Sequence, residues 1–315
     1  MKTLFKAGGI VVAWLAVPLV IVVVLFWAPD RKVDDLKARW APPPSRFVEV
    51  MDMQVHVRDE GPRDDAAPLV LLHGTSASLH TWEGWVAQIK GGRRVITLDL
   101  PGFGLTGPFP DHDYTMEHYV AFITAFLDRM GVARCVLAGN SFGGNVAWRT
   151  AHALPLRIER LVLVDSAGYP LQPTSVPIGF RIARMSGVSR IARTVLPRRV
   201  IDASVRNVYG DPGKVTPELV DRYFELTLRE GNRGALGRRL ANMPAGDDIA
   251  RIAALRLPTL ILWGGLDRLI TPASAQRFHQ DIRGSRLVMF ENLGHVPQEE
   301  DPAATMAALR AFLVQ

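Results

Sequence analysis

The sequence predicts an α/β protein in which helices cover both faces of a mostly parallel β-sheet. Two observations indicate this class. Short, continuous apolar runs such as 69–72 and 95–98 have the composition of strands that are buried on both faces of a parallel sheet. Stretches with helical spacing of apolar residues, such as 116–130, alternate with these runs along the chain. Such an alternation of strand and helix is typical of α/β folds.

The expected elements follow one another from residue 46 onward. The first two strands, 47–50 and 53–57, flank a tight turn and are expected to form an antiparallel pair at the edge of the sheet. The later strands are expected at 69–72, at 95–98, in the apolar run before Gly139, and at 161–164, 259–262 and 287–290. Helices are expected from Leu79, over 116–130, after the Gly-rich turn to about residue 153, over 273–281 and from Pro302.

The strand pattern disappears over residues 171–256, where only helical stretches with Pro and Gly breaks remain. We therefore expect a helical cap over 171–256, inserted into a catalytic core that comprises 46–170 and 257–315. The first part of the cap carries seven arginines and one acid among apolar residues, which predicts either a basic face that lies on anionic lipid or an ordinary solvated arginine face.

The N-terminal residues 1–28 are expected to form a membrane anchor. Residues 8–28 carry no charge, and this length matches the roughly 20 residues that a helix needs to cross a bilayer core. The apolar stretch is too long for the core of a cleaved signal peptide, and a buried helix of the globular domain is disfavoured because the segment is apolar all round. The charged, proline-ending stretch 29–45 is expected to be a stiff juxtamembrane linker.

The positive charges on the two sides of this span do not identify its cytoplasmic end. Signal-anchor behaviour predicts a single-pass protein with its catalytic domain on the non-cytoplasmic side of the membrane.

Composition excludes several other classes of protein. The net charge of +6 is not accompanied by a block of basic and aromatic residues, so nucleic-acid binding is not expected. The single cysteine, Cys135, excludes an intramolecular disulfide and a cysteine-based zinc site.

Ser141 is the candidate nucleophile. It stands in the sequence Gly139-Asn140-Ser141-Phe142-Gly143, between an apolar run and a predicted helix. This is the G-x-S-x-G pattern of a nucleophile elbow, in which a sharp strand-to-helix turn exposes a serine hydroxyl to a base. The pattern alone also occurs in Gly-rich loops without chemistry, so partners are required.

Asp267 and His295 are the candidate partners. Each follows a later predicted strand, and together with Ser141 they give the chain order serine, acid, histidine that this arrangement requires. Asp165, which follows the strand 161–164, is a rival for the acid, although we favour Asp267. The backbone N–H groups of Thr75 and Phe142 are the expected oxyanion donors, because Thr75 lies in an earlier strand-to-helix loop and Phe142 follows the nucleophile.

Residues 46–315 resemble the α/β-hydrolase superfamily. The motifs that carry the resemblance are His73-Gly74-Thr75, 99–104, 139–144, 264–267 and Gly294-His295. The resemblance implies an eight-stranded sheet, a cap after the sixth strand, a triad of Ser141, His295 and Asp267, and no cofactor or metal. The chain looks similar to the branch of capped serine esterases and meta-cleavage-product hydrolases. Dehalogenases and epoxide hydrolases with this cap carry an aspartate where this chain has Ser141, so their activities are disfavoured.

The sequence therefore predicts a membrane-anchored serine hydrolase that cleaves carboxylic esters through an acyl-enzyme. Its expected partners are a small lipophilic ester and membrane lipid, with no obligate protein partner. One alternative is a hydrolase that cleaves a carbon–carbon bond in a dienoate, with cap arginines holding the acidic substrate. Another is a catalytically silent binding protein on the same fold, which the three candidate residues disfavour.

Overall fold

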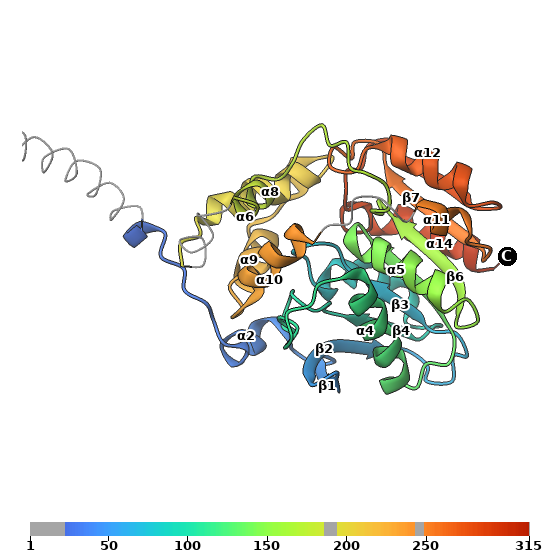
Figure 1. Ribbon diagram of the computed structural model, residues 1–315, viewed down its shortest axis with the longest axis horizontal. Coiled ribbons are helices and arrows are strands. Elements are labelled where there is room, and N and C mark those ends of the chain that lie inside the picture. Colours follow the sequence, from blue (N-terminus) through green and yellow to red (C-terminus); the bar gives the residue numbers. More distant parts are fainter. Residues whose placement is uncertain (1–22, 186–193, 243–248, 315) are drawn as a thin grey trace, which may run out of the picture.

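A computed structural model describes residues 23–185, 194–242 and 249–314. Its centre is a sheet of eight strands in the order β1-β2-β4-β3-β5-β6-β7-β8, and the α/β prediction is confirmed (Figure 1). The strands are β1 (Arg46–Val50), β2 (Met53–Glu60), β3 (Leu69–Leu72), β4 (Val95–Leu98), β5 (Cys135–Asn140), β6 (Ile158–Val164), β7 (Thr259–Gly264) and β8 (Arg286–Phe290). The pairs β1–β2 and β2–β4 are antiparallel, and all other pairs are parallel.

Helices cover both faces of this sheet because the central strands are apolar on both. In β3, Leu69 and Leu71 point into the apolar cluster that contains Trp85 and Met306, whereas Val70 and Leu72 point into the larger cluster on the other face. The first cluster lies under the 3₁₀ turn η1 (Leu79–Trp82) and helices α3 (Glu83–Ile89) and α14 (Pro302–Leu313). The second lies under α4 (Met116–Arg129), α5 (Phe142–Ala153) and α12 (Pro272–Asp281).

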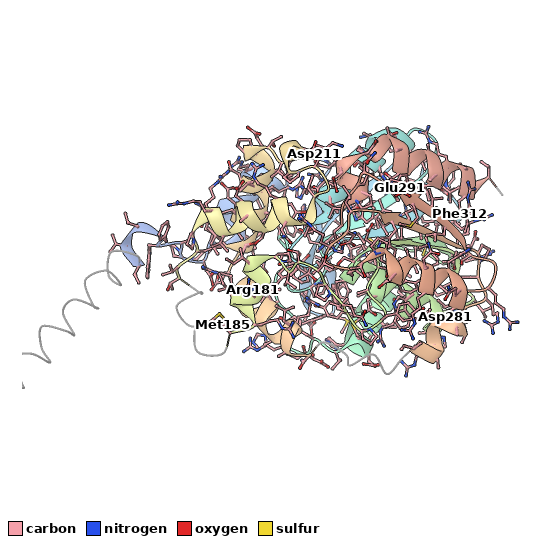
Figure 2. All side chains as sticks on the ribbon, turned by 90° about the horizontal axis from the view of Figure 1, so that it is seen from above. Arg181, Met185, Asp211, Asp281, Glu291 and Phe312 are labelled. Carbon is pink, nitrogen blue, oxygen red and sulfur yellow. The ribbon has the colours of Figure 1, made fainter. Side chains whose placement is uncertain are left out.

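A group of helices between β6 and β7 forms the cap at one end of the core (Figure 1). Its elements are α6 (Ile178–Ala183), α8 (Arg198–Val208), the 3₁₀ turn η2 (Pro212–Lys214), α9 (Pro217–Thr227) and α10 (Asn232–Ala241). The view from above places Arg181 and Met185 at this end, and Asp281 and Phe312 at the opposite one (Figure 2). The next helix, α11 (Ile249–Ala253), falls within the range expected for the cap, 171–256. It packs instead against α5 and α12 and buries Ile252 in the core.

Some of the cap arginines that the sequence groups together form ion pairs with acidic side chains of the cap. Arg198 pairs with Asp221 at 2.6 Å, and Arg206 pairs with Asp202 at 3.0 Å. Arg190 and Arg193 lie outside the described residues. Exposed ion pairs of this kind contribute little to stability, but they partly neutralise the expected basic face.

The expected membrane span, residues 8–28, lies outside the described residues except for its last part, from residue 23. Within the described ranges, no helix is both long and apolar enough to cross a membrane. The described end of the segment runs along the cap, where Ala28 N–H donates to the Thr194 carbonyl at 2.8 Å and Leu196 N–H donates to the Phe26 carbonyl at 3.0 Å.

Residues 29–45 differ from the stiff linker expected there, because they include helix α2 (Val33–Trp40), which packs on α9 of the cap. Leu36 is 1% exposed and joins Leu105 and Leu226 in a small apolar cluster. The Trp40 indole N–H donates to Glu225 at 2.6 Å. This polar helix is therefore held on the domain by tertiary contacts of a few of its residues and not by its own helix propensity.

Candidate active site

Ser141 occupies the turn between β5 and α5, with φ 55° and ψ −116°. A residue with a side chain rarely adopts a positive φ, and such strain is concentrated at functional sites. The neighbouring glycines make the turn possible. A Cβ on Gly139 would lie 2.2 Å from the Gly143 carbonyl oxygen, and one on Gly143 would lie 2.3 Å from that of Leu72. The motif thus places Ser141 at the carboxyl end of the central strand.

His295 and Asp267 lie together at the same edge of the sheet. The Nδ1 atom of His295 is 2.7 Å from Oδ2 of Asp267, and both side chains are buried. The other oxygen of Asp267 accepts the backbone N–H groups of Leu269 at 2.8 Å and Ile270 at 3.0 Å. Both carboxylate oxygens are therefore held, and an Nδ1–H donated to Asp267 leaves Nε2 of His295 free to accept a proton.

The loop that carries His295 is fixed from three sides. The backbone N–H of His295 donates to the Val208 carbonyl at the end of α8, at 2.8 Å. Its carbonyl accepts the side-chain amide of Asn140 at 3.0 Å. Glu300, in the short helix α13 (Pro297–Glu300), accepts the N–H of Gly294 at 2.7 Å and that of Gly210 at 2.9 Å. The cap and the histidine loop are thus joined through one carboxylate.

Sequence reasoning missed Asn140 and Glu300. Burial raises the pKa of the Glu300 carboxyl above its ordinary value, and three backbone N–H groups together with Lys214 oppose this shift. Asn140 directly precedes the nucleophile, so its position in the motif was an available signal. No comparable signal marks Glu300, because its partner Gly210 in the cap lies 90 residues earlier in the chain.

A cavity of about 650 Å³ lies between the cap and the core and reaches both Ser141 and His295. Thr75 also lines it, in the loop beside Ser141. A Cβ on Gly74 would lie 3.1 Å from the Cβ of Ser141, so this loop lies directly against the candidate nucleophile. Phe142 begins α5 immediately after Ser141. The structure thus brings the loops of the two expected oxyanion donors to the serine.

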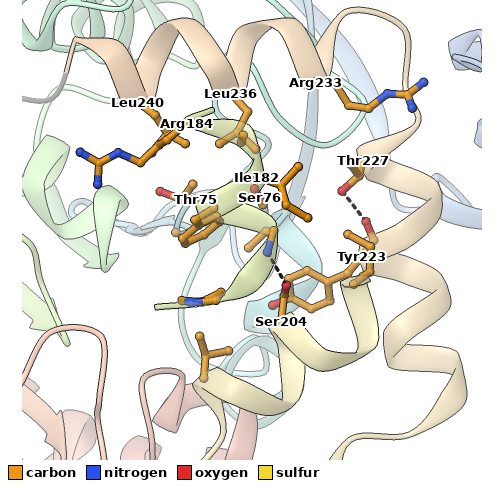
Figure 3. A pocket seen from close by; sticks show the side chains of 18 of the residues that line it. Thr75, Ser76, Ile182, Arg184, Ser204, Tyr223, Thr227, Arg233, Leu236 and Leu240 are labelled. Atoms are coloured by element: carbon orange, nitrogen blue, oxygen red, sulfur yellow. Dashed lines mark hydrogen bonds between the residues drawn. The ribbon is translucent and has the colours of Figure 1, made fainter. Parts of the chain in front are cut away.

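The wall of the cavity is mainly apolar. Leu236 and Leu240 extend into it from α10, with Ile182 from α6 below them (Figure 3). The apolar lining continues along the other elements with Phe180, Leu196, Val200, Ile201, Val205, Val208, Leu269 and Val296. The arginines Arg184, Arg233 and Arg238 also border the cavity, and Arg233 pairs with Asp30. An apolar cavity with a few polar groups at one place is typical of a site for a small molecule.

Asp165, the rival for the acid, is also buried at this edge, but Nδ1 of His295 is hydrogen-bonded to Asp267. One carboxyl oxygen of each aspartate and one ring nitrogen of His295 lie within 4.8 Å of one another. A cation would have to displace N–H groups that already occupy both oxygens of Asp267. We therefore regard the cluster as a set of hydrogen-bonded side chains and not as a metal site.

Comparisons with known proteins agree with this architecture. A 2-hydroxy-6-oxo-2,4-heptadienoate hydrolase of Pseudomonas putida is 28% identical over 278 residues, which cover 85% of this chain and 95% of the relative. The solved meta-cleavage product hydrolase of Pseudomonas fluorescens IP01 has a TM-score of 0.72 at 22% identity, covering 85% of this chain and 96% of that one.

A solved membrane phospholipase A has a TM-score of 0.72 at 24% identity and covers 99% of this chain and 98% of its own. At these identities the solved structures show the fold alone. The sequence model of the family described as "alpha/beta hydrolase fold" matches residues 67–302. The chain therefore belongs to the α/β-hydrolase family.

Proposed function

We propose that this protein is a serine hydrolase that cleaves carboxylic esters, with Ser141 as nucleophile, His295 as base and Asp267 as its orienting acid. The observation that carries the proposal is the 2.7 Å contact between His295 and Asp267 at a cavity that Ser141 also lines. The strained backbone of Ser141 is a second support. Such a conformation costs free energy, and residues that adopt it are concentrated at active sites.

In the proposed reaction, the Ser141 hydroxyl adds to the ester carbonyl carbon while Nε2 of His295 takes its proton. The negative carbonyl oxygen accepts the N–H groups of Thr75 and Phe142. The intermediate then collapses, the bond from the carbonyl carbon to the alkoxy oxygen breaks, and His295 returns the proton to the leaving alcohol. Water repeats these steps on the acyl-enzyme and releases the acid. Asp267 stays ionised and stabilises the imidazolium throughout.

The lining of the cavity favours lipophilic esters. Each buried methylene group contributes about 0.8 kcal/mol when it leaves water. An acyl chain that lies against the apolar side chains of α8 and α10 would gain this free energy for each methylene group that it buries. Binding that extends to the reacting carbonyl also orients it against Ser141.

Gly237 offers a direct test of this substrate class. It lines the cavity from α10, and a Cβ there would meet nothing nearer than the Ala183 carbonyl oxygen at 3.9 Å. We expect Gly237→Leu to lower kcat/KM for long-chain p-nitrophenyl esters by about tenfold or more. The kcat/KM for the acetate ester should change little, because the added side chain fills volume that only long acyl chains use.

Gly91→Leu, at an exposed position with no neighbour within 4 Å, is the matched control. An equal loss for all chain lengths would contradict this placement of the acyl chain.

Cleavage of a carbon–carbon bond is the second candidate, and the 28% identity to a dienoate hydrolase favours it. The same serine, histidine and acid would serve both reactions, so substitutions of these residues cannot distinguish them. The two activities are distinguished by comparing substrates. The wild-type protein is assayed with aryl esters and with a vinylogous 1,5-diketone under the same conditions. Higher kcat/KM for the diketone would replace the ester assignment.

We also propose that residues 8–28 anchor the protein in a membrane, with the catalytic domain on the non-cytoplasmic side and membrane lipid as its partner. The uncharged stretch of that length supports this. We expect extraction from membranes of the expression host to need detergent. Release by an alkaline high-salt wash would contradict a spanning segment.

A further inference from the structure

Asp165 is a buried acid that the reaction above leaves without a role. It follows β6 with φ 44°, a left-handed conformation that aspartate tolerates better than most residues. Its backbone N–H donates to the Leu262 carbonyl of β7 at 3.0 Å, while Ser141 N–H donates to the Val164 carbonyl at 2.9 Å. Asp165 therefore stands between the strand of the nucleophile and the strand that precedes Asp267.

The carboxyl group of Asp165 has an incomplete set of partners. Its Oδ1 accepts the Gly264 N–H at 3.0 Å. Its Oδ2 is fully buried and meets no donor among the described residues. The carboxyl group of Asp267 is its neighbour, with an oxygen within 4.8 Å of a carboxyl oxygen of Asp165. Two ionised carboxylates in this position would repel each other and leave a buried oxygen unsatisfied.

The surrounding donors decide which of the two acids carries the proton. Asp267 accepts two backbone N–H groups and faces Nδ1 of His295, whereas Asp165 accepts one backbone N–H. The nearby carboxyl of Glu300 also disfavours a further negative charge at Asp165. Burial first and the charge of Asp267 second raise the pKa of Asp165 well above its ordinary value.

We propose that Asp165 is a positioning residue: as a neutral carboxylic acid it donates a hydrogen bond to Asp267 and holds that carboxylate in place for His295. The proposal rests on the function proposed above for Ser141, His295 and Asp267. No proton is transferred in the resting state, since the hydrogen stays bonded to Asp165 while Asp267 accepts it. A charge lost from Asp267 would allow Asp165 to ionise beside His295.

Two substitutions separate the hydrogen bond from the backbone. Asp165→Asn keeps a neutral donor, and Asp165→Gly removes it; both residues tolerate a positive φ. We expect kcat/KM for a p-nitrophenyl ester to fall by no more than about threefold in Asp165→Asn. In Asp165→Gly it should fall by about tenfold or more, the effect of losing one hydrogen bond to a charged group. Equal losses in the two variants would overturn the proposal.

A stability measurement tests the proton itself and does not depend on activity. Above the ordinary aspartate pKa of about 4, the folded protein would hold a proton at Asp165 that the unfolded chain has released. The wild type then loses stability as the pH rises towards the folded-state pKa, and Asp165→Asn does not. We expect the melting temperature of Asp165→Asn, relative to wild type, to increase between pH 5 and pH 8. A difference that stays constant with pH would overturn the proposal, even if the ester assignment holds.

The double variant Asp165→Asn/Asp267→Asn shows the coupling between the two acids. With Asp267 neutralised, Asp165 becomes the carboxylate beside His295, so its replacement should now cost about tenfold or more of the residual kcat/KM. Additive effects of the two substitutions would show that Asp165 is a bystander. Reaction of wild-type Ser141 with a fluorophosphonate probe reports separately on the proposed nucleophile. A failure of that function is therefore distinguishable from a failure of this inference.

Discussion

Ser141→Ala is expected to reduce kcat for ester hydrolysis by on the order of 10⁵ to 10⁶, the scale of loss when the nucleophile of a serine hydrolase is removed. The hydroxyl forms the covalent bond to the acyl group, and no other group at this turn replaces it. The backbone strain at φ 55° stays the same, because serine and alanine both carry a Cβ. The folded structure should therefore survive, and the melting temperature should change little.

The measurement for Ser141→Ala combines kcat with labelling of the full-length protein by a fluorophosphonate probe. Peptide mapping should locate the label at Ser141 in the wild type and find none in the variant. Ser285→Ala is the control, because this serine lies on the surface and contacts His279. Residual activity above a tenth of wild type, or a folded wild-type sample that the probe does not label, would reject the proposed nucleophile.

Asp267→Asn is expected to lower kcat by about 10⁴, the effect seen when the triad acid of a serine protease becomes an amide. The amide presents an N–H or a less basic oxygen to Nδ1 of His295, which favours the wrong tautomer of the imidazole. It also weakens the acceptor that holds the backbone N–H groups of Leu269 and Ile270.

Asp281→Asn is the matched control for this substitution, since Asp281 accepts the Tyr169 hydroxyl away from the cavity. Circular dichroism and melting curves establish that both variants fold, and steady-state kinetics with a short-chain ester gives the loss. A decrease below tenfold in Asp267→Asn would show that another group orients His295.

The strands could be predicted because the sequence pattern that marks a buried strand lies within the strand itself. Buried parallel strands read as short apolar runs, and all eight expected runs lie within or match the observed strands. The turn at Ser141 was equally readable, since only small residues fit at Gly139 and Gly143. Positions that depend on sterics within a few residues are therefore visible in a single sequence.

Features that depend on distant contacts were less predictable. Helix α2 lies where a linker was expected, and what distinguishes it is the burial of Leu36 against Leu226. Helix α11 belongs with the core because Ile252 packs there, although its sequence continues the helical pattern of the cap. In both cases the partner lies far along the chain, and no local pattern identifies it.

The sequence by itself determined the fold class, the strand-to-helix setting of Ser141 and the chain order of the three candidate residues. These follow from periodicity, from glycine sterics and from the rule that parallel strands place their following loops at one edge. Only the tertiary structure decided which aspartate contacts His295, how Asn140 and Glu300 hold its loop, and that an apolar cavity joins the cap to Ser141. Distances of a few ångströms between separate strands set these features, and hydrogen bonds and proton sharing depend on such distances.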